Sequence, residues 1–139
     1  AIRIPFIEVH LSNVFARDLE PVWRECYRVL HPGGHLLCGF MNPAVYLFDH
    51  DEADATGELV VRYSLPYSDE KSLSLSKLNA KVAAKAPVEF SHSLTMQIGG
   101  QTEAGLAVIG LYEDHWYDDT WLFSNRSPVC IATRAVRPR

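Results

Sequence analysis

Residues Trp23 to Pro43 read WRECYRVLHPGGHLLCGFMNP, and this stretch decides the fold. Its first part is amphipathic, because apolar side chains recur at spacings of three and four on one helical face. Those apolar residues are Val22, Trp23, Cys26, Val29 and Leu30. Pro32 cannot continue a helix, and Gly33 or Gly34 can adopt the left-handed conformation that closes one. His35–Met41 is then mostly apolar on both faces, which is typical of a strand buried between helical layers. The stretch predicts a helix, a tight loop and a central strand of a parallel α/β sheet.

The segments on either side extend this pattern. Phe6–Leu11 is predicted to be a strand parallel to His35–Met41, with Asp18 as the N-cap of a helix that runs to Leu30. Downstream, composition and periodicity predict an exposed loop, an alternating strand, two helices and two final strands. These elements are His50–Gly57, Glu58–Leu65, Ser76–Ala86, Ser91–Ala104, Ala107–Tyr112 and Val129–Val136, in that order. The predicted central core is Leu36, Leu37, Phe40, Val108, Ile109, Leu111, Cys130 and Ile131.

Two sequence blocks resemble class I S-adenosylmethionine-dependent methyltransferases. The first matches the family pattern W-x-E-x-x-R-V-L-x-P-G-G-x-L, from Trp23 to Leu36. The second, SHSLTMQIGGQTEAGLAVIGLYE from Ser91 to Glu113, looks like the family's last helix, its turn and its sixth strand. The resemblance begins at about His10 and implies a partial Rossmann-like α/β sheet, with parallel strands and a final antiparallel pair.

The family's main cofactor-binding features have no counterpart in the sequence. Methyltransferases of this class use a glycine-rich loop after their first strand and an acidic residue after their second. Only 22 residues precede Trp23, and they contain no G-x-G loop. The resemblance therefore implies that residues 1–139 form the C-terminal part of a methyltransferase domain, from about the fourth strand onward. It also implies that residues 44–90 are an insertion that covers the substrate as a lid, the alternative being an edge elaboration without a ligand role.

Ligands of parallel α/β sheets bind beyond the carboxyl ends of the strands. In the family, the loop after the fourth strand lies beside the methyl end of S-adenosylmethionine. The resemblance therefore assigns His10, Ser12 and Asn13 to cofactor binding. The alternative is a turn network that holds the start of the next helix.

Two further strand ends are candidates for substrate binding. Asn42, Tyr46 and Phe48 follow one strand, and His115 and Trp116 follow another. Aromatic walls can orient an acceptor and exclude water, although the same side chains can simply pack beneath the insertion. No residue is assigned a catalytic role.

Composition limits the partners of the protein. The chain has 139 residues, is 47% hydrophobic and carries a formal net charge of −4. This balance argues against nucleic acid as a main partner, because binding to phosphates needs a basic surface. No apolar run reaches membrane-spanning length, and the cysteine and histidine spacing predicts no metal site. Three cysteines in apolar segments favour buried free thiols in the cytoplasm.

The expected function is methyl transfer from S-adenosylmethionine to a small-molecule acceptor. This activity is expected of the parent protein, while the isolated chain is expected to bind the cofactor weakly and to be inactive. The alternative is a non-catalytic α/β interaction module. An unpaired edge at the N-terminal strand predicts a homo-oligomer that associates through it.

Overall fold

A computed structural model describes residues 3–116 and 120–139, and its centre is a four-stranded sheet in the order β1-β2-β4-β3. The strands are β1 (Ile4–His10), β2 (Leu30–Met41), β3 (Ala107–Asp114) and β4 (Cys130–Val136). β1 and β2 pair in parallel, while β4 lies antiparallel between β2 and β3. The predicted fold class is confirmed, including the parallel pair and the final antiparallel pair.

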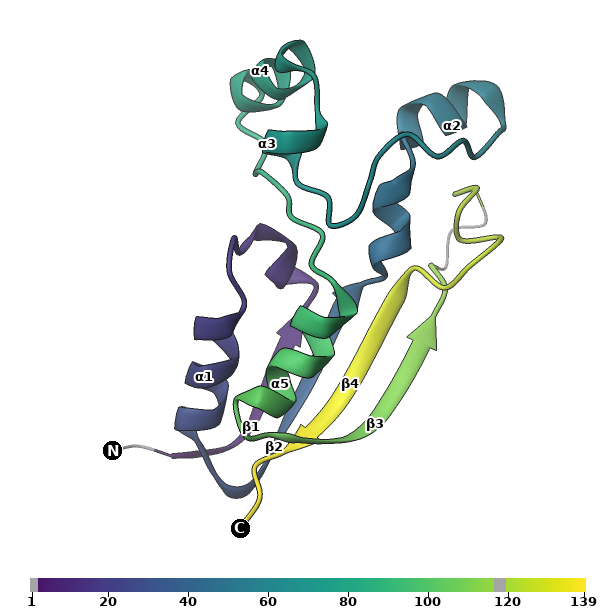
Figure 1. The fold of residues 1–139 in the computed structure, drawn as a ribbon. Helices are drawn as coiled ribbons and strands as arrows, with labels where there is room; N and C mark the ends of the chain where they lie inside the picture. The colour runs from purple at the N-terminus through teal and green to yellow at the C-terminus, as the bar shows by residue number, and fades with distance from the viewer. Residues whose placement is uncertain (1–2, 117–119) are drawn as a thin grey trace.

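Two helical segments cover one face of this sheet (Figure 1). They are α1 (Glu20–Val29) and a continuous segment made of the π-helical turn η3 (Thr95–Gly99) and α5 (Gly100–Glu103). Trp23 of α1 is fully buried between them, and its indole nitrogen donates to the Met96 carbonyl at 2.8 Å. Gly100 permits this contact, because a Cβ there would lie 2.6 Å from the Trp23 ring.

The start of α1 differs in detail from the prediction. The helix begins at Glu20 with Leu19 at the N-cap, where no side chain caps it. Asp18 instead accepts a hydrogen bond from the Glu20 amide at 3.0 Å, from one residue further out. The helix existed as predicted, but Asp18 is not its N-cap.

The core lies between the sheet and the two helical segments. Leu36 and Phe40 are fully buried and Ile131 is 6% exposed, as predicted. Leu37 points to the opposite face and is only partly buried, while Ile109 and Leu111 are 54% and 53% exposed. Val108 and Cys130 are intermediate. The predicted core was therefore wrong for one face, because side chains alternate across a strand and both helical segments pack on the other face.

Residues 43–90 form a group of short helices beyond the carboxyl ends of β1 and β2 (Figure 1). The helices are η2 (Pro43–Leu47), α2 (His50–Thr56), α3 (Asp69–Ser72) and α4 (Leu75–Ala83). Helix α4 was predicted, whereas the expected loop at His50–Gly57 is helix α2. The expected strand at Glu58–Leu65 makes only one isolated bridge, between Phe48 and Val61. The apolar and polar residues of Glu58–Leu65 alternate as in a strand, but in the described structure this segment forms no ladder with a neighbouring strand.

Candidate functional site

The loop after β1 turns sharply at Leu11, whose φ of 47° is left-handed, and continues as the 3-10 turn η1 (Ser12–Phe15). His10 is exposed at the end of β1, where its Nε2 lies 3.1 Å from a carboxylate oxygen of Glu8. Ser12 is exposed, and Asn13 is buried. The structure thus separates the three predicted cofactor residues into two at the surface and one in the interior.

Asn13 anchors this loop to the helix that covers the sheet. Its amide nitrogen donates to the Gln97 side-chain oxygen at 2.7 Å, while its own side-chain oxygen is buried without a hydrogen-bond partner. The buried hydrogen bonds continue along the helix, since the side-chain amide of Gln101 donates to the Gln97 backbone carbonyl and to the Thr133 hydroxyl. The π-helical turn places Gln97 toward the loop. The Asn13 side chain is therefore held by Gln97 on the side that faces the sheet and the covering helix.

A buried histidine holds the same loop from the other side. His92 Nε2 lies 2.8 Å from the Ala16 carbonyl and 3.2 Å from the Asn13 carbonyl. Nε2 must carry the proton to donate to these oxygens. The neighbouring Phe90 amide donates to the Val14 carbonyl at 2.7 Å. The segment that leaves the insertion is thus bonded directly to the loop after β1.

Asn42 follows β2 directly and connects two loops. Its side-chain oxygen accepts from the Ala44 amide at 3.0 Å, and its side-chain nitrogen donates to the Pro128 carbonyl at 2.8 Å. Asn42 therefore caps η2 and joins the end of β2 to the segment before β4. Its assignment to substrate binding stays a prediction.

The insertion contains a cavity of about 520 Å³, and the predicted residues Tyr46 and Phe48 line it. Tyr46 and Tyr67 stack with ring centroids 5.2 Å apart, and Tyr63 meets Tyr67 edge-on at the same distance. Three tyrosine rings from η2 and from the extended segment before α3 therefore make one aromatic wall.

Charged groups form the other part of the cavity lining. Lys81 of α4 lies 2.6 Å from the Asp69 carboxylate and 3.3 Å from the Glu89 carboxylate. Tyr67 donates to Asp69 at 2.7 Å, and Tyr46 donates to Glu89 at 3.0 Å. Burial alone would raise the pKa of Asp69, but hydrogen bonds from Lys81, Tyr67 and the Glu89 amide lower it below the usual value. Burial raises the pKa of both Tyr46 and Tyr67, so both phenols stay neutral.

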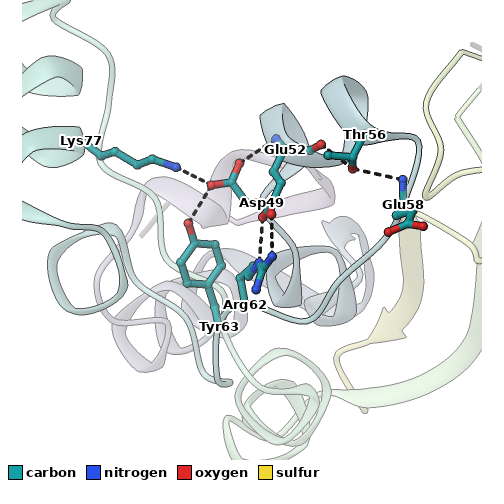
Figure 2. A network of polar contacts seen from close by, with 7 residues as sticks. All are labelled: Asp49, Glu52, Thr56, Glu58, Arg62, Tyr63 and Lys77. Atoms are coloured by element: carbon teal, nitrogen blue, oxygen red, sulfur yellow. Dashed lines mark hydrogen bonds and ion pairs between the residues drawn. The ribbon is translucent and has the colours of Figure 1, made fainter.

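A second polar network joins α2 to α4, and three of its residues, Asp49, Tyr63 and Lys77, line the same cavity (Figure 2). Asp49 caps α2 by accepting from the Glu52 amide, and it also pairs with Lys77 and accepts from the Tyr63 hydroxyl. Glu52 in turn holds Arg62 through two hydrogen bonds of 2.6 and 2.8 Å. The bond from Lys77 lowers the pKa of Asp49.

His115 and Trp116 lie apart from the tyrosine cavity. His115 Nδ1 is 2.7 Å from the Ser124 carbonyl. Trp116 is 48% exposed and lines a separate hollow of about 240 Å³ together with Asp54 and Trp121. The structure therefore groups Tyr46 with Phe48 and leaves the other two predicted substrate residues elsewhere.

Sequence reasoning missed most of the polar side chains of the cavity. Tyr63, Tyr67, Asp69, Lys81 and Glu89 come from segments without a recognisable motif. One signal was present, because Ser68 and Ser74 are strong N-cap residues before short polar helices. Those caps predict α3 and the start of α4, but not which side chains face inward.

The loop after β1 carries the residues that the resemblance assigns to S-adenosylmethionine. The unpaired buried oxygen of Asn13 and the exposed Ser12 hydroxyl lie at the carboxyl end of the strand, where the family places the cofactor. In residues 3–116 and 120–139, no strand is followed by a glycine-rich turn, and no group of three metal-ligating side chains occurs. The loop therefore offers one accessible polar side chain, Ser12, beside the buried oxygen of Asn13, and the assignment of both to the cofactor stays a prediction.

The comparisons with known proteins agree with this geometry. No family model matches the chain. It is 45% identical over 104 residues to the uncharacterized methyltransferase YbaJ of Bacillus subtilis (strain 168), and the match covers 75% of this chain and 40% of YbaJ. Known structures share the fold at low sequence identity. The S-adenosylmethionine-dependent methyltransferase of Mesorhizobium loti matches with a TM-score of 0.68 at 16% identity, over 97% of this chain and 62% of that one.

A putative S-adenosylmethionine-dependent methyltransferase of Listeria monocytogenes matches with a TM-score of 0.65 at 12% identity, over 99% of this chain and 62% of that one. The chain thus spans less than two thirds of each of these relatives. With β4 lying antiparallel between β2 and β3, these matches confirm that the chain carries part of the class I S-adenosylmethionine-dependent methyltransferase fold.

Proposed function

We propose that the protein transfers a methyl group from S-adenosylmethionine to a small-molecule acceptor. In this proposal the described residues supply one wall of the cofactor site and the cavity that receives the acceptor. The observation that carries it is the bonding of the insertion to the loop after β1, through Phe90 to Val14 and His92 to Asn13 and Ala16. Glu89, the neighbour of Phe90, lines the tyrosine cavity, so these bonds hold the cavity next to the expected cofactor loop. Methyl transfer requires the acceptor and the cofactor to be held close together.

The chain's own residues would act mainly by position. Ser12, His10 and Asn13 would hold the cofactor, which supplies an already activated methyl group when bound. His92 holds the backbone of that loop and Gln97 holds the Asn13 side chain, so the loop needs little reorganisation when the cofactor binds. Tyr46 and Phe48, with residues 44–90 as a lid, would orient the acceptor and exclude water. Asn42, His115 and Trp116, at the other strand ends, lie outside the lining of the tyrosine cavity, and their contact with substrate stays a prediction.

Calorimetric titration with S-adenosylmethionine tests the cofactor part in the protein that contains this chain. Ser12→Ala is expected to weaken binding by about two- to tenfold, the range for one lost hydrogen bond. Ser64→Ala, an exposed serine in the insertion, is the matched control and should bind as the parent does. Undetectable binding in the full-length protein would refute methyl transfer. In the isolated 139-residue chain we expect weak binding, because its sequence has no glycine-rich loop after a strand.

We also propose that the chain self-associates through β1. β1 is an outer strand of the four-stranded sheet, and Phe6 on it is 49% exposed. An unpaired strand edge with an apolar neighbour favours pairing with a second strand. Light scattering over a concentration series tests this, and a monomer at high micromolar concentration would contradict it.

The proposed setting is the cytoplasm, with no nucleic acid or membrane partner. Burial raises the pKa of the Cys38 thiol to about 12, and Cys26 is also buried, so both are interior side chains. Within the described part of the chain, no helix has the length and apolar character needed to cross a bilayer. The net charge of −4 supports the absence of nucleic acid from the proposed partners.

A further inference from the structure

The tyrosine cavity has an excess of negative charge. Four carboxylates line it, from Asp49, Asp51, Asp69 and Glu89, against the ammonium groups of Lys77 and Lys81. At the end of the cavity next to Tyr46 and Tyr67, Asp69 and Glu89 share the single ammonium of Lys81. One negative charge is therefore left uncompensated among these three side chains.

The two acidic side chains differ in what they can still bind. Asp69 is 3% exposed, and its oxygens already accept from Tyr67, Lys81 and the Glu89 amide. Glu89 is 34% exposed and accepts from Tyr46 at 3.0 Å and from Lys81 at the longer distance of 3.3 Å. Glu89 is thus the accessible carboxylate at this end of the cavity.

The walls suit the same kind of ligand. Tyr46, Tyr63 and Tyr67 form a contiguous aromatic surface in the cavity lining. The faces of aromatic rings attract organic cations, and the attraction grows where water is excluded. Lys81 shows how an alkylammonium is held here, because its charged end sits between two carboxylates that tyrosine hydroxyls orient.

We propose that this cavity binds the ammonium end of an organic amine, with Glu89 as its carboxylate partner and the three tyrosine rings as its walls. The volume of about 520 Å³ leaves room for the organic part of such a ligand. Binding as such is independent of methyl transfer. If the proposed function is correct, the amine is also the class of methyl acceptor, and this conclusion alone rests on that function.

The test compares two probes of equal shape, 2-phenylethylammonium and 2-phenylethanol, without S-adenosylmethionine. Amide shifts in NMR titrations give both the site and the Kd. We expect shifts around Tyr46, Tyr67 and Glu89, and a Kd for the ammonium at least about tenfold below that for the alcohol, because paired charges of this kind contribute on that scale. Higher salt should reduce the preference.

Glu89→Gln should bring the two affinities to within about threefold, since it removes the charge and keeps the shape. Glu58→Gln changes an exposed carboxylate outside the cavity and should leave the preference intact. Equal binding of both probes, no binding, or shifts confined to another surface would overturn the proposal. None of these results would bear on cofactor binding, which is measured separately.

A second variant covers the case in which Glu89→Gln disturbs folding. Lys81→Met removes the internal ammonium and leaves Asp69 and Glu89 without a cation. Its Tm should fall, and 2-phenylethylammonium should raise that Tm more than 2-phenylethanol does, because the ligand replaces the lost charge. Lys71→Met, an exposed lysine outside the cavity lining, should show no such difference. A Lys81→Met protein that the ammonium does not stabilise would show that the pair with Asp69 is structural only.

Discussion

The sheet with its two helical segments and the insertion at residues 43–90 are held together by different forces. Trp23, Leu36 and Phe40 are fully buried and apolar, and they join α1 and the α5 segment to the sheet. The insertion has an apolar cluster around Val45 and Phe48, but its part from Tyr63 to Glu89 is held largely by tyrosine hydroxyls and ion pairs, such as Tyr67 to Asp69 and Lys77 to Asp49. Apolar burial depends little on pH or salt, whereas charged contacts depend on both. Low pH or high salt should therefore loosen the polar part of the insertion while the sheet stays folded.

Two adjacent residues of β2 give the largest expected effect. Leu36 is fully buried under the helical segments, whereas Leu37 is partly buried on the other face. Leu36→Ala should lower the free energy of unfolding by about 2–5 kcal/mol, the range for a buried leucine. Leu37→Ala should cost clearly less. Urea denaturation of both variants measures the difference, and equal losses would mean that the second face is also covered.

A smaller effect is expected where α1 meets α5. Gly100→Ala places a Cβ 2.6 Å from the Trp23 ring, so the helices must shift at a cost of about 1–3 kcal/mol. Gly99→Ala is the matched control, because its Cβ would make an ordinary 3.6 Å contact with Thr95. Thermal unfolding should separate the two variants. A Gly100→Ala protein as stable as the control would show that the α1–α5 contact is loose.

Asp69→Asn should weaken the insertion and leave the sheet unchanged. It removes the charge that pairs with Lys81 inside a buried site, and the local opening free energy should fall by about 1–2 kcal/mol. Hydrogen exchange at amides of α3 and α4 measures that opening, with amides of β2 as the internal reference. Asp54→Asn, an exposed position in α2, serves as the control. Equal changes in the insertion and in β2 would show that the two regions unfold together.

The smallest effect concerns pH. The pKa values of Asp49 and Asp69 are lowered in the folded protein, so their stabilisation is complete above the ordinary carboxylate range near about 4. It is lost as pH falls through the lowered values. Between pH 7 and about 5 no change is expected, and at lower pH amide exchange should rise in α3 and α4 before it rises in β2. Loosening of the insertion already at pH 6 would implicate other groups.

The sequence was most informative where one pattern had one physical solution. The spacing of Trp23, Cys26 and Leu30 predicted α1, and the apolar run after Pro-Gly-Gly predicted the strand at His35–Met41. The expected loop at Pro-Gly-Gly was wrong, because β2 begins at Leu30 and includes these three residues. This pattern did not determine which face of β2 the helices cover. Leu37 was wrongly assigned to the core, because the side chains on both faces of β2 are apolar. Helix α2 was missed although both of its signals were present, since Asp49 caps its start and Gly57, at φ 74°, ends it.

The candidate site was less predictable than the fold. Tyr46 and Phe48 line a cavity, and they were singled out because they follow a strand whose carboxyl end the sequence indicated; their contact with substrate stays a prediction. Tyr67, Asp69 and Glu89 reach the same cavity from distant parts of the chain, and only the path of the insertion brings them together. Their pairing depends on tertiary distances such as that from Tyr46 to Glu89, which no local spacing encodes.

The position of β4 has a consequence for the order of events during synthesis. β4 follows β3 in the chain, yet it lies between β2 and β3 and pairs with both. When the ribosome has made β3, the strand that will connect it to the rest of this sheet does not yet exist. β3, with Ile109 and Leu111 on it, must wait unpaired until Cys130–Val136 has emerged. Nascent chains halted before that point should therefore be the ones that chaperones bind and that aggregate.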